Sequence, residues 1–171
     1  MTKALIVYYS RTNHTHKIAE LVAQGVGANV ERIFDVQSRE GAFGYMRSGR
    51  EAMLQRPGRI QPVKEDPSQY DLTILGSPVW SWSLSPPMRS YALAQQHKFK
   101  RVAFFCTEGG SGGGRLFGQL QTLCGKPPVA TLEITEGELK SGEYAGKVRE
   151  FIRQISGVIA SAVPESGHQG L

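Results

Sequence analysis

The sequence predicts an α/β fold, namely a three-layer, doubly wound sheet of five parallel strands. Five short apolar runs, rich in β-branched and aromatic residues, recur along the 171 residues, as expected for strands that are buried on both faces. Amphipathic helical patterns lie between these runs, and parallel neighbours require such crossover connections. A doubly wound sheet binds ligands beyond the carboxyl ends of its strands. The loops after the first, third and fourth strands are therefore the candidate site.

The five expected strands are each short, apolar and uninterrupted. They occupy Ala4–Tyr9, Val30–Val36, Leu72–Leu75, Val102–Cys106 and Val129–Ile134. The helices between them are recognised by apolar residues that repeat three and four positions apart. The clearest such stripe lies near the end of the chain and consists of Val148, Phe151, Ile152, Ile155, Ile159 and Ala162. Weaker stripes run through Ile18, Leu21, Val22 and Gly25, and through Met88, Tyr91, Ala92 and Gln95.

One segment and one terminus depart from this rhythm. The segment from Glu40 to Pro67 is expected to be the second crossover, with a short helix around Tyr45–Leu54 and a local concentration of arginines at Arg47, Arg50, Arg56 and Arg59. Residues 163–171 carry proline, glycine and polar residues without periodicity, which predicts a disordered tail. The organisation expected is one domain over residues 1–162 followed by that tail.

Composition excludes several classes of protein. No apolar run approaches the roughly 18 residues of a membrane span, so we expect no integral membrane segment, and the start of the chain is interpreted as a strand. Two cysteines without CxxC spacing predict neither a disulfide framework nor a zinc site, and they suit the reducing cytoplasm. The net charge of +5 favours anionic partners, but no nucleic-acid-reading motif is present, so nucleic acid is not an expected partner.

The loop after the first strand predicts a phosphate site. Helix starts offer unpaired amides and a positive dipole end, and hydroxyl groups add donors without a counter-charge. The alternative is that one residue merely caps the helix, but three hydroxyls spaced S-x-T-x-x-T exceed that need. The candidate residues are Ser10, Thr12, Asn13, His14 and Thr15.

The loop after the third strand is apolar and aromatic, which is unusual at a ligand edge. An indole gives a large rigid surface against a planar ring, although tryptophans are often ordinary core residues. The candidate residues are Pro78, Val79, Trp80, Ser81 and Trp82.

The loop after the fourth strand is rich in glycine, which allows close approach of the backbone to a ligand. A flexible connector is the alternative. Glu108 in this loop could influence a bound ligand through its charge, but exposure to solvent is the simpler expectation. The candidate residues are Thr107, Glu108, Gly109, Gly110 and Gly112.

These three loops together resemble those of flavodoxins. The order of strands and helices matches that family over approximately Thr2–Ala162, without the long insertion of the larger subclass. The flavodoxin phosphate loop is [S/T]-x-T-G-x-T, to which Ser10, Thr12 and Thr15 correspond, while Asn13 replaces the glycine. Asparagine tolerates left-handed backbone better than other non-glycine residues. The resemblance implies that the first loop wraps the phosphate of FMN, that the third loop holds one side of the isoalloxazine, and that the fourth meets its polar edge.

For the aromatic loop, the resemblance favours Trp80 as the flavin contact, and Trp82 is open between flavin contact and core. No catalytic side chain is expected, because the flavin carries the redox chemistry. Cys106 and Cys124 are expected to be buried, apolar groups.

Two activities follow from the resemblance: an oxidoreductase that passes electrons from NAD(P)H to a quinone or similar acceptor, or a carrier between redox partner proteins. Carrier flavodoxins are typically acidic, and this basic chain favours the oxidoreductase. A binding module that has lost FMN is a third alternative. A signalling receiver domain, which shares the architecture, is opposed because the acidic residues that it needs for magnesium are missing after the first and third strands. The oligomeric state is left open.

Overall fold

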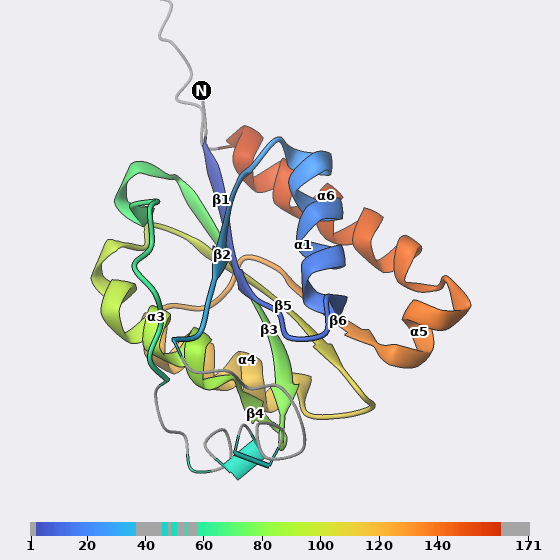
Figure 1. The fold of residues 1–171 in the computed structure, drawn as a ribbon. Coiled ribbons are helices and arrows are strands. Elements are labelled where there is room, and N and C mark those ends of the chain that lie inside the picture. Colours follow the sequence, from blue (N-terminus) through green and yellow to red (C-terminus); the bar gives the residue numbers. More distant parts are fainter. Residues whose placement is uncertain (1–2, 37–45, 48, 51–53, 55–57, 162–171) are drawn as a thin grey trace, which may run out of the picture.

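The computed structural model describes residues 3–36, 46–47, 49–50, 54 and 58–161 (Figure 1). Its sheet confirms the expected fold class, since five strands pair in parallel in the order β2-β1-β3-β5-β6. These are β1 Ala4–Tyr9, β2 Asn29–Ile33, β3 Leu72–Trp80, β5 Val102–Glu108 and β6 Thr131–Thr135, with a short antiparallel strand, β4 Ser83–Leu84, added to β3.

Helices cover both faces of this sheet. They are α1 His14–Val26, α3 Pro86–Gln95, α4 Gly113–Cys124, α5 Glu136–Ser141 and α6 Tyr144–Ser161, with 3₁₀ turns η1 Pro67–Gln69 and η2 Gln96–Lys98.

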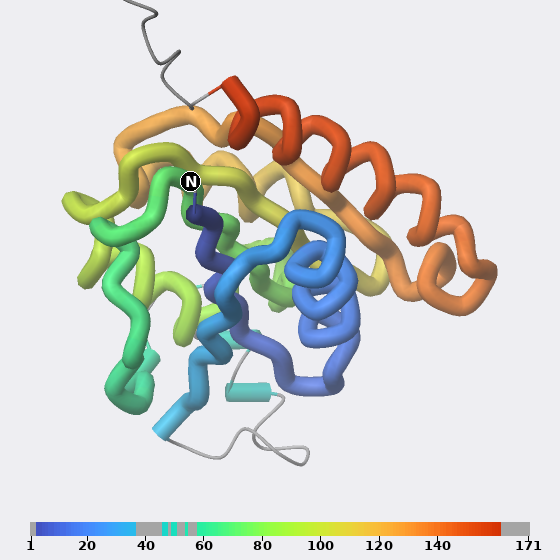
Figure 2. Tube along the Cα trace, turned by 90° about the horizontal axis from the view of Figure 1, so that it is seen from above, coloured from blue at the N-terminus to red at the C-terminus, as the bar shows by residue number. Residues whose placement is uncertain are grey.

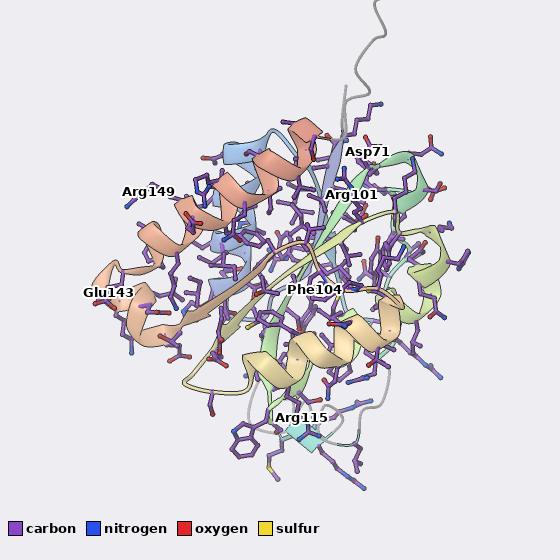
Figure 3. The ribbon with its side chains drawn as sticks, turned by 180° about the vertical axis from the view of Figure 1, so that it is seen from behind. Asp71, Arg101, Phe104, Arg115, Glu143 and Arg149 are labelled. Atoms are coloured by element: carbon purple, nitrogen blue, oxygen red, sulfur yellow. The ribbon has the colours of Figure 1, made fainter. Side chains whose placement is uncertain are left out.

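The core is divided by the sheet into two layers. On one face Ile18 of α1 and Phe151 of α6 pack against the strands, and Figures 1 and 2 show these two helices side by side. On the other face Met88 of α3 and Leu116 of α4 are buried. Phe104 of β5 points into this second layer, where its ring stacks on Phe117 of α4 with centroids 6.4 Å apart (Figure 3). Buried apolar contact on both faces is the main stabilising term of such a sheet.

Two strands are longer than expected and a hairpin replaces a loop. β3 continues through Gly76–Trp80 because Ser77 pairs with Cys106 and Pro78 with Thr107 on β5. A proline is tolerated there because the pairing of β1 with β3 ends at Gly76, so the side of Pro78 that faces β1 needs no ladder hydrogen bond. Similarly, β5 includes Thr107 and Glu108, which the sequence had assigned to a loop.

The turn from β3 into β4 consists of two residues with left-handed backbone. Ser81 has φ 48° and Trp82 has φ 58°, as type I′ hairpin turns require of both central residues. Neither residue is the glycine or asparagine that favours this conformation. The candidate loop after the third strand is thus a tight hairpin tip.

The remaining differences concern edges and connections. β2 ends at Ile33 instead of Val36, and Asp35 instead forms an antiparallel bridge with Ile60. The expected crossover helix is seen as helical backbone at residues 46–47 and 49–50, and its other residues lie outside the described ones. The predicted tail also lies outside them. Helix α5 was not predicted, because its six residues are too short to show an apolar period.

Among the helices in the described part of the chain, none has the length and apolar character needed to cross a membrane.

Candidate functional site

A cleft of about 260 Å³ opens at the carboxyl edge of the sheet, the lower edge in Figure 1, where the loops after β1, β3 and β5 meet. All but three of its lining residues belong to the predicted site; Arg11, Gly49 and Glu136 are additional. The lining consists of Arg11, Thr12, His14, Gly49, Pro78, Val79, Trp80, Ser81, Thr107, Glu108, Gly109 and Glu136.

The first loop leaves the start of α1 open to an anion. Asn13 precedes the helix with φ 66° and ψ 3°, a left-handed conformation that glycine adopts more readily than other residues. The amide of His16 donates to Ser10 Oγ over 3.2 Å, whereas the amides of His14 and Thr15, at the first two helical positions, have no intrahelical partner. The first turn carries no acidic residue, so its positive dipole end is uncompensated there.

One hydroxyl of this loop ties it to the sheet. Thr15 is 2% exposed, and its Oγ1 lies 2.8 Å from Thr107 Oγ1 on β5. Each hydroxyl has a single proton, so when Thr107 donates to Thr15, the proton of Thr15 is available to another acceptor. Thr12 is exposed and has no such constraint.

Arg32 on β2 reaches the same loop, and the sequence did not point to it. Its Nη2 donates to the Ser10 carbonyl oxygen and to Asn13 Oδ1, each over 3.2 Å. The sequence pattern points to the loops that follow strands, whereas Arg32 lies within strand β2. Only the pairing of β2 beside β1 brings the two together.

The two tryptophans of the third loop have different surroundings. Trp80 is half-buried, lines the cleft and meets the Tyr9 ring edge-on, with centroids 5.4 Å apart at 88°. Trp82, at the hairpin tip, is 62% exposed and donates from Nε1 to Ser111 Oγ over 3.2 Å. It is absent from the cleft lining. Trp80, and not Trp82, therefore forms part of the cleft wall.

The glycines of the fourth loop have two separate uses. A Cβ added to Gly109 or Gly110 would meet nothing within 4 Å, so the backbone there stays accessible. Gly112 has φ 118°, and a Cβ there would lie 2.8 Å from Val79 Cγ1 and 3.0 Å from Trp82 Cα. Gly112 thus lets the hairpin pack against the start of α4 and is not part of the cleft lining.

Glu108 is buried, which corrects the expectation of an exposed loop carboxylate. Its side chain is 5% exposed and accepts a hydrogen bond from the Gly113 amide over 2.9 Å. Burial, and then a hydrogen bond with the Glu133 carboxyl on β6, raise the pKa of Glu108 to about 7. The cleft therefore has an amide-rich, basic end at α1 and an acidic end at β5.

Other residues missed by sequence reasoning lie in connections. Glu136 directly follows β6, whose carboxyl end lies at the same edge of the sheet. The expectation that ligands bind beyond the carboxyl ends of parallel strands would have pointed to Glu136 if it had also been applied to the last strand. Gly49 lies in the crossover, where an added Cβ would be 2.8 Å from Ser81 Oγ. No local sequence pattern predicts the contact between Gly49 and Ser81.

Neither cysteine is part of the cleft. Cys106 and Cys124 are free and buried, as expected. Burial raises the pKa of both thiols, that of Cys124 to about 12. They are inert, neutral groups at ordinary pH.

Fold and cleft together define a doubly wound α/β protein with an anion-binding helix start and an aromatic wall at one sheet edge. The chain belongs to the flavodoxin family, a family of FMN-binding flavoproteins, since the Flavodoxin family model matches residues 3–152. No curated protein matches the sequence.

Solved structures support the same fold. A putative flavoprotein from Bacteroides eggerthii is similar with TM-score 0.73 and 24% identity, over 94% of this chain and 99% of that one. A flavoprotein in complex with FMN from Lactobacillus acidophilus gives TM-score 0.65 and 21% identity, over 85% and 99%. Oxidised Flavodoxin 2 from Bacillus cereus gives 0.57 and 20%, over 92% and 99%. At these identities the likeness concerns the fold.

Proposed function

We propose that this chain binds FMN in the cleft and is an oxidoreductase that passes electrons from NAD(P)H to a quinone or similar small acceptor. The observation that carries the proposal is the joining of an anion-binding helix start and the half-buried Trp80 in one cleft. A flavin mononucleotide requires both, since it has a phosphate at one end and a planar ring at the other.

The residues present fit FMN. Its phosphate would meet the free amides of His14 and Thr15 and the exposed hydroxyl of Thr12, with no carboxylate in the first turn of α1 to oppose it. Trp80 would hold one side of the ring, because an indole favours offset contact with an aromatic plane. The unobstructed backbone at Gly109 offers amide and carbonyl groups to the polar edge.

FMN, when bound, supplies the transfer of one or two electrons. The protein's part is to orient the ring and to set the charge around it. Trp80 excludes water from the ring, and Glu108 places a titratable carboxyl group at the lining of the cleft. A protonated Glu108 holds a proton near neutral pH, where a carboxyl group would ordinarily have lost it.

Charge supports a nucleotide as electron donor. The net charge is +5, and Arg11 lines the cleft. Arg115, at the start of α4, is exposed at the same edge (Figure 3), as are Arg47 and Arg50. Arginines at the mouth of a cleft attract phosphate groups of a dinucleotide.

One observation favours a carrier as the second candidate. Trp82 is 62% exposed on the rim beside the cleft, and Met46 is 69% exposed in the crossover. Exposed tryptophan is typical of residues that anchor protein partners. A redox partner protein would then replace NAD(P)H as the donor.

The cytoplasm is the compartment that we propose. Two free, buried thiols suit a reducing environment.

An absorption spectrum of the purified protein tests the proposal, first with FMN added and then with NADPH added without oxygen. Bound flavin that NADPH bleaches supports the oxidoreductase. Bound flavin that NADPH leaves oxidised, but that a separate reductase bleaches, supports the carrier. A protein that does not bind FMN would be a module that has lost its cofactor, and the proposal would be wrong.

A further inference from the structure

The left-handed backbone of Asn13 needs a partner that holds it. Asn13 has φ 66°, a conformation that costs energy for a residue with a Cβ. Its side chain makes no hydrogen bond to the start of α1 that would cap the helix. The local sequence therefore does not explain why the loop stays in the conformation that leaves the helix amides open.

Arg32 supplies that partner from the neighbouring strand. Its Nη2 contacts both ends of the turn, the Ser10 carbonyl oxygen and Asn13 Oδ1, each at 3.2 Å. The guanidinium group is also held between two rings, with its Cζ 5.9 Å from the Tyr8 centroid and 5.4 Å from that of Phe34. A planar group fixed on two sides and bonded at one end is pre-organised.

The rest of the loop is supported from the same side. Tyr8 on β1 forms a hydrogen bond between its hydroxyl and His16 Nδ1, and the His16 amide donates to Ser10 Oγ. The His16 ring therefore links β1 to α1. Arg32 stacks on Tyr8, so strand, helix and loop form one connected support.

Among the described residues, Arg32 has no acidic partner. Its Nε is buried among them without a hydrogen-bond partner. The nearest helix end, that of α1, is itself the positive end of a dipole. An anion that binds between these two positive groups would be stabilised by both of them.

We propose that Arg32 is a positioning residue for the phosphate subsite, and that its fixed charge makes the protein select FMN over riboflavin. The inference rests on the proposed binding of FMN. Arg32 acts through the Ser10 carbonyl oxygen and the Asn13 side chain, to which it donates, and through its charge. A dianionic phosphate monoester is the group that this arrangement recognises, and a flavin without phosphate gains nothing from it.

The test is a pair of titrations, FMN and riboflavin, each followed by flavin fluorescence for the intact protein and its variants. In Arg32→Gln we expect FMN affinity to fall about tenfold or more, while riboflavin affinity stays within about twofold, because charge-assisted bonds exceed neutral ones. Arg32→Lys, which keeps the charge but not the planar fork, should fall between Arg32→Gln and the parent. FMN binding should weaken with salt less steeply in Arg32→Gln than in the parent.

Two further variants separate the roles of Arg32. Asn13→Gly removes the backbone cost, so the double variant Arg32→Gln with Asn13→Gly should regain the part of the affinity that depends on loop conformation and not the part that depends on charge. Arg101→Gln is the matched control: it also removes one positive charge, but Arg101 precedes β5 at the opposite edge of the sheet and bonds to the Val158 carbonyl oxygen (Figure 3). It should leave both affinities unchanged.

Loss of FMN and riboflavin affinity to the same degree in Arg32→Gln and Arg32→Lys would overturn the inference, because a purely structural tether would act on both ligands. So would unchanged FMN affinity in a variant that melts at the parent's temperature. Both results leave FMN binding by the parent protein intact, so they do not touch the proposed function. If the parent protein binds no FMN, both the inference about Arg32 and the proposed function are wrong.

Discussion

The carboxyl group of Glu108, at the end of β5, lies close to that of Glu133 on the neighbouring strand β6, and burial together with this neighbour raises the pKa of Glu108 to about 7. The register explains the contact, since Cys106 pairs with Glu133 and Glu108 with Thr135. Two carboxyl groups form a hydrogen bond only when one of them carries a proton. At the lining of the cleft the protein therefore keeps a carboxylic acid that is neutral at mildly acid pH.

This pair makes stability depend on pH. The pKa of Glu108 is about 7 in the folded protein and near 4.5 when unfolded, so the unfolded chain loses this proton first. Its stabilising contribution is complete below about pH 4.5 and is lost as pH rises through 7. We expect Glu108→Gln to flatten the change in unfolding free energy between pH 5 and pH 8 by roughly 1–3 kcal/mol in urea titrations.

Glu143→Gln is the control for this prediction, because Glu143 is exposed on the turn before α6 (Figure 3). It should retain the pH slope of the parent. An unchanged slope in Glu108→Gln would show that Glu108 does not titrate in this range.

The threonines of the first loop should differ in their effect on stability. Thr12→Ala removes an exposed hydroxyl, and we expect weaker FMN binding with an unchanged unfolding midpoint. Thr15→Ala also removes the bond to Thr107 in a buried position, so it should weaken FMN binding and cost about 1–3 kcal/mol of stability. FMN titration and thermal unfolding measure the two effects.

Thr122→Ala provides the comparison for both, since Thr122 is exposed on α4 and its hydroxyl donates to the Gly118 carbonyl oxygen. It should leave FMN binding unaltered. If Thr12→Ala and Thr15→Ala bind FMN as tightly as the parent, the first loop is not a phosphate site.

Substitution of the two tryptophans should have different effects on the fluorescence of bound flavin. Trp80→Ala removes the wall of the cleft, and we expect brighter bound flavin and weaker FMN binding because the quenching indole is lost. Trp82→Ala, at the exposed hairpin tip, is the matched variant and should leave the emission of bound flavin nearly as it is. Steady-state emission of the FMN-loaded proteins measures this, and the reverse result would assign the ring contact to Trp82.

Gly76 on β3 allows Phe105 to pack against the sheet. A Cβ at this position would lie 2.0 Å from Phe105 Cζ, so Gly76→Ala must displace a buried ring. We expect a loss of about 3 kcal/mol, because overpacking a filled core costs this much. For a chain of this length, that lowers the melting temperature by roughly 6–12 °C.

Gly118→Ala is the opposite case on α4, where a Cβ would meet nothing within 4 Å. Alanine is a better helix former than glycine, and we expect a gain of up to about 1 kcal/mol. Differential scanning calorimetry of the two variants compares them directly. Equal melting temperatures for Gly76→Ala and the parent would mean that the Phe105 ring has room to move.

Sequence patterns predicted the architecture well, because they record which residues are buried. β1 has the predicted bounds, and the apolar stripe of α6 buries Val148, Phe151 and Ile155. The predicted third strand ended too early, at Leu75, because the glycine and proline that follow interrupt the apolar pattern. The pairing of β3 with β5 extends it.

Within the candidate site, the sequence by itself determined which loops meet, since parallel strands end at one edge of a sheet and three such loops carried hydroxyl, aromatic and glycine residues. Tertiary structure alone decided which of those residues line the cleft. It placed Trp80 inside and Trp82 outside, buried Glu108 against Glu133, and brought Arg32 to Asn13. These contacts join residues that are distant in sequence. Local periodicity could not predict them, because it indicates whether a residue is buried but not which residue lies beside it across the sheet.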